Sequence, residues 1–505
     1  MKQSIALKKL KRALSLAIGS EFFQIIWAID ALGRGNSPDV SNIFRHPPEA
    51  KGAKIGDKYA IFPWDMEDLI NVELVTPKKF GKKNRTWNCK DWSVFAELHS
   101  RLKTYHDLQH STSDSAIDLL SVIAHKQFSW QRGYLHYNLF YRSAYLYGGD
   151  AAQKHMKDTL GFSLNNFSLC GFLLISHFLG NPWAKLPPNI SEFPQVSSET
   201  MRAVISHISK PIDELRSHAK VLRKNKPYHT YSPSILRQFP CAEFSNSQLT
   251  CPLIDLLVAR VTEGVYYDVI SGSTSIHNEI GSRFESYSLR YLQKSFSSFE
   301  VLPEIEYGSR RKPIKSPDII VKQDEEIVLL VECKATRMPL DIKFKLTNES
   351  KASDKFKEIA KGVCQIWRCY SDIRLGRLND CYISDNALGL VLTLEDWTTL
   401  NRGMMTQIME AANTLADKNS DITVADRKTI AICHIDNFES LLRDSNEDTF
   451  LNTIRKQEAN DFGGWNLLSI HERKYPKTKE NKPFPFKEEL GDVLPWYKIL
   501  QTLEE

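Results

Sequence analysis

Apolar residues in the first half of the chain recur mainly at helical spacing, with polar residues between them. The pattern predicts helices near residues 3–32, 91–107, 113–126, 150–160, 163–180 and 198–223. Proline-rich breaks separate these segments at residues 47–48, 187–188 and 227, and residues 228–240 have the composition of an extended connector. Residues 1–240 are therefore expected to form a mainly α-helical domain.

The pattern changes beyond residue 240, where helices alternate with short β-branched runs. Residues 241–274 are expected to connect the two halves. After them the sequence predicts strands at 299–307, 317–321, 327–335, 387–394 and 428–434, and helices at 279–294, 353–374, 403–418 and from about residue 436. The run Ile327–Val331 is apolar on both faces, which predicts a central strand in a sheet covered on both sides. We expect an α/β core over 275–435 and a helical extension over 436–505.

Composition and charge refine this interpretation. The chain has 505 residues, of which 42% are hydrophobic and 25% charged, so disorder as its main state is excluded. Its net charge of +5 is unevenly spread: residues 1–250 hold 32 basic and 21 acidic side chains (+11), and residues 251–505 hold 34 and 40 (−6). The first half thus suits contact with a polyanion, and the carboxylates of the second suit a cation, although two solvated surfaces of opposite sign remain an alternative.

Cysteines and apolar segments indicate a cytoplasmic protein with no membrane partner. The nine cysteines form no C-x-x-C pair, which favours a reducing compartment. The basic segment at the start of the chain has the pattern of an amphipathic helix, without a cleavage site. The most apolar stretch, 167–180, is shorter than the roughly 20 residues that cross a bilayer, and we expect a buried helix there.

Candidate chemistry lies at the ends of two consecutive predicted strands. Pro317-Asp318 opens one, and Glu332-Cys333-Lys334 ends the next. A hairpin brings Asp318 to the same end of the sheet as Glu332 and Lys334, which share a face because they are two residues apart, whereas Cys333 points to the other face. Two carboxylates beside an apolar run fit a divalent cation, and hard oxygen ligands favour Mg²⁺. Similar triplets at Glu472-Arg473-Lys474 and Glu480-Asn481-Lys482 lie in polar, loop-like sequence and serve as internal controls.

These residues resemble the PD-(D/E)xK nuclease superfamily over roughly residues 275–435. The resemblance implies an α/β nuclease core of the restriction-endonuclease-like type, with a central mixed sheet flanked by helices. It also implies that Asp318, Glu332 and Lys334 are catalytic, and that Asp318, Glu332 and the carbonyl of Cys333 hold Mg²⁺, for which Mn²⁺ can substitute. An ordinary surface salt bridge on a hairpin is the structural alternative.

A helix before the hairpin extends the resemblance. Gly281-Ser282-Arg283-Phe284-Glu285 is similar to the first helix of Mrr-type nucleases, in which a Glu after Phe often adds a metal-site carboxylate. Glu285 is expected either to join the metal site or to face solvent.

Several cations near the motif are candidates for phosphate contact. They are Arg310, Arg311, Lys312 and Lys315 before Asp318, and Lys357, Lys361 and Arg368 on the helix after the motif strand. Gln365 on that helix is a possible auxiliary residue, although the Gln-x3-Tyr spacing of exonuclease branches is missed by one position. A solvated helix face is the alternative for the second group.

The function expected from the resemblance is Mg²⁺-dependent hydrolysis of phosphodiester bonds, with DNA as the substrate more than RNA. A homo-oligomer, or partner subunits of a bacterial defence complex or mobile element, would accompany it, and the helical half would recognise a target or regulate the nuclease. Two alternatives stay open: an inactive nuclease-fold binding protein, or an RNase acting through Arg101 with His106 or Arg202 with His207. Weaker signals are the basic segments 78–87 and 223–226 and the strand-end His434.

Overall fold

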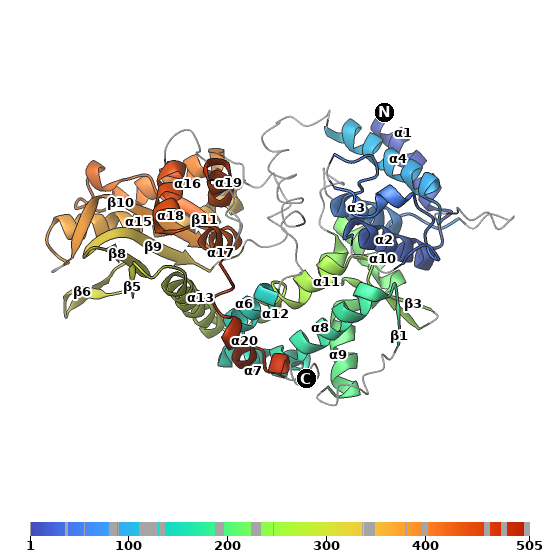
Figure 1. Ribbon diagram of the computed structural model, residues 1–505, viewed down its shortest axis with the longest axis horizontal. Coiled ribbons are helices and arrows are strands. Elements are labelled where there is room, and N and C mark those ends of the chain that lie inside the picture. The colour runs from blue at the N-terminus through green and yellow to red at the C-terminus, as the bar shows by residue number, and fades with distance from the viewer. Residues whose placement is uncertain are drawn as a thin grey trace. The chain divides into compact units, whose positions relative to one another are not determined.

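The computed structural model describes residues 2–35, 39–54, 56–79, 88, 90–110, 130, 137–186, 196–223, 234–245, 247–335, 337, 349–378, 381–395, 402–458, 465–475 and 482–498. Within these ranges, the side chains of residues 110, 312, 349–355, 402–404 and 458 are not described. The predicted helix at 113–126, most of the basic segment 78–87 and residues 224–226 therefore lie outside the described residues. The chain divides into two compact units (Figure 1), one of Met1–Gly272 with Gly491–Glu505 and one of Ser273–Leu490.

The first unit is mainly helical, as the sequence predicts. Its helices are α1 (Lys2–Leu14), α2 (Gly19–Gly33), α3 (Pro63–Leu74), α4 (Trp92–His110), α6 (Tyr137–Tyr147), α7 (Asp150–Leu160), α8 (Leu164–Gly180), α9 (Ser198–Ile208), α10 (Ile212–Arg223), α11 (Ile254–Val261) and α12 (Val265–Val269). A small sheet of order β1-β4-β3-β2 accompanies them, formed by β1 (Ala184–Lys185), β2 (Ser209–Pro211), β3 (Cys241–Phe244) and β4 (Gln248–Thr250).

Three boundaries in this unit differ from the prediction. The segment expected to be one helix over 3–32 is two helices, α1 and α2, and β2 with Pro211 divides the helix expected over 198–223. Residues 241–272 are not a connector: β3, β4, α11 and α12 fold as part of the first unit. Their strands are three or four residues long, and such short runs give a weak periodic signal.

Helix α3, which the sequence analysis did not predict, is buried along its whole length from Trp64 to Leu74 and carries four carboxylates. Asp65 lies 2.9 Å from His99 Nε2, and Glu73 lies 2.6 Å from Lys78 Nζ. The Arg237 guanidinium donates to both carboxylate oxygens of Glu67, at 2.8 and 3.0 Å. Because buried carboxylates need such partners, several cations of the basic first half are neutralised inside the fold.

The second unit has a five-stranded mixed sheet of order β11-β10-β9-β8-β5. Its strands are β5 (Glu300–Pro303), β8 (Ile319–Gln323), β9 (Glu326–Lys334), β10 (Tyr382–Thr393) and β11 (Ala431–His434). Strand β9 pairs antiparallel with β8 and parallel with β10, so the predicted central position of Ile327–Val331 is confirmed. An α/β core beside a helical region is therefore the architecture of the chain.

Helices cover both faces of this sheet. On one face, α15 (Glu349–Arg374) and α16 (Arg402–Ala416) bury Phe356, Val363 and Trp367 against Ile320 and Leu330. The other face is covered by α13 (Thr274–Ser295) and α17 (Ile435–Asp444), which a hydrogen bond of 2.8 Å joins from Tyr287 Oη to Glu439. The apolar stripes predicted for the helices at 279–294 and 353–374 supply these contacts.

The segment expected to be one strand over 299–307 is divided. Strand β5 ends at Pro303, and β6 (Glu306–Ser309) pairs with β7 (Lys312–Lys315) in a separate two-stranded hairpin. The chain turns at Glu304-Ile305 because Ser316 Oγ and the Ser316 amide both bond the Ile305 backbone, at 2.9 and 3.0 Å.

The expected C-terminal extension is shared between the units. Helices α18 (Glu447–Glu458) and α19 (Leu467–Lys474) belong to the second unit, whereas residues from Gly491 onward, including the end of α20 (Leu490–Val493), belong to the first. Trp496 stacks on Phe172 of α8 with ring centroids 4.8 Å apart, and its Nε1 donates to Ser168 Oγ at 3.1 Å. This contact fixes the returning segment in the first unit.

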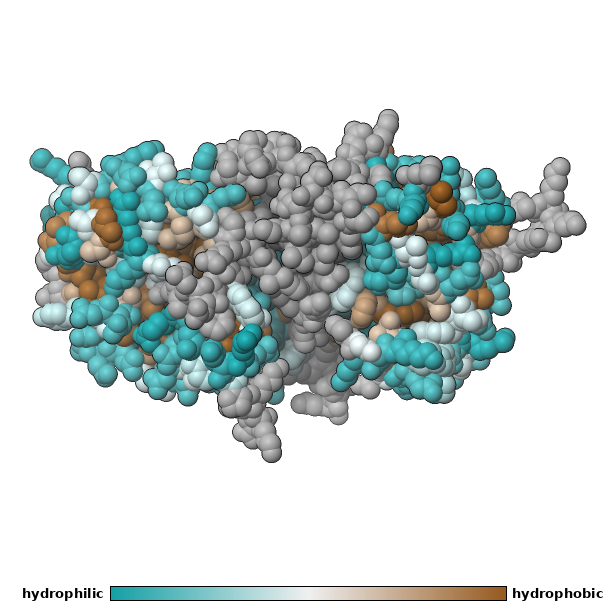
Figure 2. Space-filling model, turned by 90° about the horizontal axis from the view of Figure 1, so that it is seen from above, coloured by the Kyte–Doolittle hydropathy of each residue, from teal (hydrophilic) through white to brown (hydrophobic). Residues whose placement is uncertain are grey.

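In the part of the chain that the structure describes, no single helix is long and apolar enough to cross a membrane. Two sharply bent pairs, α1 with α2 and α7 with α8, reach that length and composition only when each pair is counted together. The space-filling view (Figure 2) shows mainly hydrophilic side chains on the visible face, with smaller apolar patches between them.

Candidate functional site

A tight hairpin places Asp318 beside the end of β9. Strands β8 and β9 are joined at Asp324 and Glu325, both with positive φ of 50° and 67°, which is the geometry of a two-residue turn between twisted strands. The register pairs Ile319 with Val331, so the preceding Asp318 lies level with Glu332. The Cys333 amide donates to Asp318 Oδ2 at 2.7 Å, which fixes that carboxylate.

Glu332 and Lys334 share one face of the strand, as their spacing predicts. Lys334 Nζ donates to Glu332 Oε1 at 2.6 Å and to Gln365 Oε1 at 2.9 Å. Gln365 lies on α15, which packs on this face of the sheet, so the helix contributes a side chain to the site. The structure thus brings together Asp318, Glu332, Lys334 and the auxiliary candidate Gln365.

The close approach of α15 depends on Gly362, which the sequence analysis did not single out. A Cβ atom added at Gly362 would lie 3.0 Å from Lys334 Cε and 3.2 Å from Glu332 Cγ. Real Cβ atoms are rarely this close to other heavy atoms, so any larger residue must displace the catalytic candidates. A glycine in a predicted amphipathic helix, one turn before Gln365, was the available signal.

Cys333 points to the opposite face, again as predicted. Its thiol is buried beside Ser288 of α13, and burial raises the pKa of the thiol well above its usual range, with the Asp318 and Glu332 carboxylates adding to the effect. Only its backbone belongs to the site, because a buried thiol with a raised pKa is a poor nucleophile.

Burial raises the pKa values of the carboxylates of the site, and neighbouring cations offset only part of this effect. Burial first, and then the neighbouring Asp318 carboxylate, raise the pKa of Glu332 to about 8 despite the Lys334 ammonium. Burial also raises the pKa of Asp318. Glu285 on α13 interacts with both Asp318 and Lys334, and its pKa is raised to about 7 by burial and by the Asp318 carboxylate. Glu285 is therefore part of the same charged cluster, which sequence spacing alone left open.

One oxygen of this cluster lacks a partner. Glu332 Oε2 is buried, in a side chain that is only 2% exposed. It accepts no hydrogen bond from the described residues. Such a group costs about 1–3 kcal/mol or more when charged, unless a ligand satisfies it. Among the described residues, no group of three or more His, Cys, Asp or Glu side chains is arranged to hold a metal ion.

The cations expected before Asp318 lie on the β6–β7 hairpin. Arg310 and Arg311 are exposed at its turn, and the Lys312 side chain is outside the described residues. Lys315 pairs with Glu304 at 2.7 Å, and its charge is close enough to Asp318 and Glu285 to lower their pKa values against the effect of burial. Lys315 is therefore beside the carboxylates, and the two arginines lie further along the hairpin.

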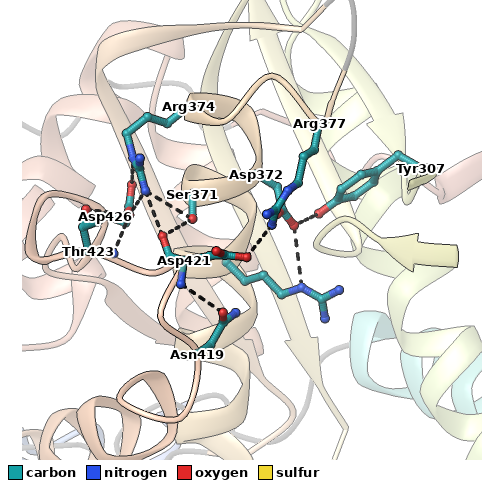
Figure 3. A network of polar contacts seen from close by, with 10 residues as sticks. Tyr307, Ser371, Asp372, Arg374, Arg377, Asn419, Asp421, Thr423 and Asp426 are labelled. Carbon is teal, nitrogen blue, oxygen red and sulfur yellow. Dashed lines mark hydrogen bonds and ion pairs between the residues drawn. The ribbon is translucent and has the colours of Figure 1, made fainter. Parts of the chain in front are cut away.

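A polar network holds this hairpin against α15 (Figure 3). Tyr307 Oη of β6 donates to the buried Asp372 Oδ2 at 2.7 Å, and Arg377 Nη1 donates to Asp372 Oδ1 at 2.9 Å. Arg377 also bonds Asp421 at 2.7 Å, while Arg374 bonds Asp426 through two nitrogens at 3.0 and 2.8 Å. Sequence spacing gave no sign of this network, because its members are far apart along the chain.

The basic stripe expected on α15 is partly neutralised by its own helix. Lys361 Nζ lies 2.7 Å from Glu358, and Arg368 Nε lies 3.6 Å from Asp372. Lys357 is exposed on the same helix. These side chains have less unbalanced positive charge than the sequence suggested.

The described residues of the control triplets have surroundings different from those of the site. Glu472, Arg473 and Lys474 are exposed on α19, a helix and not the loop expected from their composition. Glu480 and Asn481 lie outside the described residues, and Lys482 Nζ bonds the Ser295 carbonyl at 2.9 Å. Glu472-Arg473-Lys474 therefore ends a helix and does not follow a sheet strand.

The arginine and histidine pairs do not form sites. Arg101 is bound to Glu97 at 2.6 Å, whereas His106 is buried 3.4 Å from Asp68. His207 lies 3.1 Å from Asp268, and Arg202 on the same helix is exposed. Five residues along a helix separate two side chains by about 140°, so each pair faces different surroundings.

His434 ends β11 as predicted and is buried, with Asp436 at 3.5 Å.

Comparison of the chain with protein-family models, curated proteins and solved structures found no match.

Proposed function

We propose that the chain is a Mg²⁺-dependent nuclease of the PD-(D/E)xK type, acting through Asp318, Glu332 and Lys334. The observation that carries the proposal is the pair of strand-end carboxylates with raised pKa values, one of which has a buried oxygen with no hydrogen-bond partner among the described residues. The mixed sheet, with α13 and α15 on its two faces, is the arrangement that the restriction-endonuclease-like fold requires.

The donor set fits magnesium. Mg²⁺ is usually bound by one or two protein carboxylates and keeps several waters or substrate oxygens, so a pair of carboxylates is sufficient. Asp318 and Glu332 would hold the ion, with the Cys333 carbonyl as a further oxygen donor, and Mn²⁺ would take the same ligands. Among the described residues no three carboxylates are arranged around one ion, so Glu285 is left outside this donor set. When bound, the metal polarises the scissile phosphate and lowers the pKa of a water ligand.

The chain's own groups orient and stabilise the reacting atoms. Lys334 presents its ammonium next to Glu332, where it stabilises the negative charge that grows on the phosphate in the transition state. Gln365 and Glu332 hold this ammonium by two hydrogen bonds, so little side-chain freedom is lost during the reaction. Glu285 is near its pKa at neutral pH and is suited to accept or release a proton at the edge of the site.

DNA is the proposed substrate, and the biological setting is proposed as bacterial defence or a mobile element in the cytoplasm. Double-strand cleavage needs two such sites, which favours a homo-oligomer or partner subunits. The described cysteines are all free thiols, which agrees with a reducing compartment.

One observation favours the alternative of an inactive binding protein: Lys334 already occupies Glu332 Oε1. Isothermal titration with Mg²⁺ and Mn²⁺, followed by incubation of matched DNA and RNA with the loaded protein, separates the two. A nuclease binds the metal and cleaves one of the polymers, whereas an inactive binder leaves both intact.

A further inference from the structure

Four of the six exposed side chains of helix α1 are cations, and the other two are Ser4 and Ile5. Lys2, Lys8, Lys9 and Arg12 are exposed, and the helix contains neither Asp nor Glu. Its apolar side is used in the fold, where Ala6, Leu10, Ala13 and Leu14 are buried and α1 packs on α3 and α4.

The four cations form one stripe. At about 100° per residue they fall within roughly 120° of the helix circumference. The axial distance from Lys2 to Arg12 is about 15 Å at 1.5 Å per residue. The distance from Lys2 to Arg12 spans a few consecutive phosphates of a nucleic-acid strand. Phosphate charges along such a strand are spaced more regularly than the charges on a protein surface.

The carboxylates near the first unit's other cations contrast with the surroundings of this stripe. Among the described residues none of the four is ion-paired, in contrast to Lys78, Lys103 and Arg237 of the same unit, which are paired with carboxylates of α3. Burial lowers the pKa of the adjacent Lys11, and the Arg223 guanidinium adds a smaller effect of the same sign. On α4, Glu97 is paired with Arg101 at 2.6 Å, and Arg101 also donates to the Lys9 carbonyl.

We propose that the exposed face of α1 is a docking surface for the phosphate backbone of a nucleic acid, independent of base sequence. The choice of partner rests on the proposed nuclease function, and the surface would give the first unit a substrate-holding role. A lipid bilayer is disfavoured because the apolar side of α1 is already buried and Ile5 is the one large apolar side chain, 48% exposed, among the cations.

The test is a triple variant, Lys8→Gln with Lys9→Gln and Arg12→Gln, in the full-length chain. Binding to a fluorescent 30-base-pair duplex is measured in EDTA over a range of salt concentrations, so that cleavage plays no part. The matched control is Lys154→Gln with Lys157→Gln and Lys220→Gln, which removes the same charge from exposed positions on α7 and α10. A second control, Lys8→Arg with Lys9→Arg, keeps the charge on α1.

The slope of log K against log salt is expected to decrease by about 2 to 3 in the α1 variant, because each lost phosphate contact contributes roughly 0.9. Both controls should keep the slope of the wild type. Equal slopes for the two Gln variants overturn the proposal. A second result would also overturn the proposal: the α1 variant loses binding to vesicles of equal phosphatidylcholine and phosphatidylglycerol while its DNA binding is unchanged. Failure of the nuclease proposal alone appears as DNA binding that depends on α1 but is never followed by cleavage with Mg²⁺.

Discussion

Glu332 is the residue that most clearly ties the fold to the proposed chemistry. Its pKa of about 8 in the folded chain lies above the ordinary glutamate value of 4.5, because the side chain is buried next to Asp318. Between these two pH values the folded chain binds more protons than the unfolded chain, so the metal-free protein should lose stability as pH rises. The strand-end position that makes Glu332 a metal ligand candidate is therefore also a source of instability without metal.

Substitution of Glu332 tests this directly. In Glu332→Gln, the fall in melting temperature between pH 5 and pH 8 should be smaller than in the wild type, because the ionisable group is gone and the shape is kept. Mg²⁺ should raise the melting temperature of the wild type more at pH 8 than at pH 6, since the cation competes with protons. Scanning fluorimetry in EDTA and in Mg²⁺ provides both comparisons, with Glu472→Gln on the exposed face of α19 as the control. Identical pH profiles for wild type and Glu332→Gln would show that this carboxyl is not the group that titrates.

At the scale of residues, the sequence correctly predicted the face of the strand to which each side chain points. It did not predict which contacts those side chains make. The period of two in a strand correctly placed Glu332 and Lys334 on one face and Cys333 on the other. The bond from Lys334 to Gln365 could not be predicted, and neither could the lack of a partner for Glu332 Oε2 within the described part of the chain, because both depend on how α15 crosses the sheet.

At the scale of elements, the contact between α15 and β9 controls the geometry of the site. Gly362→Ala should displace Lys334, whose Cε would be 3.0 Å from the new methyl group, and cleavage should fall by about ten- to a hundredfold. Gly281→Ala on α13 meets no atom within 4 Å, so it should stabilise the helix by up to about 1 kcal/mol and leave cleavage unchanged.

Urea unfolding and initial cleavage rates of the two glycine variants separate the effects. Gly362→Ala is expected to lack most of the stabilisation that Gly281→Ala gains, because the methyl group crowds β9. If both variants cleave like the wild type, the close approach of α15 is not needed for the site.

The β6–β7 hairpin is the second element with a specific contact to test. Tyr307→Phe removes the hydrogen bond to the buried Asp372 and should cost about 1.5–3 kcal/mol, as bonds to charged groups do. Hydrogen exchange of the hairpin amides, residues 306–315, should become faster. The control Tyr382→Phe changes a side chain that is 72% exposed and should alter stability by less than about 0.5 kcal/mol. Unchanged exchange in Tyr307→Phe would mean that other contacts hold the hairpin.

Helices and strands with a long periodic pattern of apolar residues were predicted correctly. Elements whose presence or bounds depend on tertiary contacts were not. Strand β9 and helices α13 and α15 carry strong stripes and were predicted, whereas the division of 299–307 depends on Ser316 bonding the Ile305 backbone. Helix α3 was missed because its buried carboxylates interrupt any apolar stripe, and partners from other helices compensate them.

At the scale of the whole molecule, the chain joins a helical unit to an α/β unit and returns to the first with its last segment. The boundary between the two units at Gly272 was expected only as a connector somewhere within residues 241–274. The return of residues from Gly491 onward to the first unit was not expected at all. Trp496, which anchors the return on Phe172 and Ser168, has no local pattern that distinguishes it from any aromatic residue. Long-range contacts of this kind cannot be deduced from neighbouring residues.

The uneven charge of the chain has a structural basis at this scale. Some of the 32 basic side chains of residues 1–250 are paired with the carboxylates of α3, and others are exposed on α1, while carboxylates of the second half gather at the end of β9.

The most direct test of the central claim is cleavage of supercoiled plasmid in Mg²⁺ by the full-length chain and three variants. Wild type and the exposed control Glu472→Gln should nick or linearise the DNA, and EDTA should stop both. Asp318→Asn and Lys334→Met should be slower by about 100- to 1,000-fold while keeping the circular dichroism of the wild type, because each loses one interaction of the transition state. Equal rates for wild type, Asp318→Asn and Lys334→Met, or no cleavage by any of them, would contradict the account.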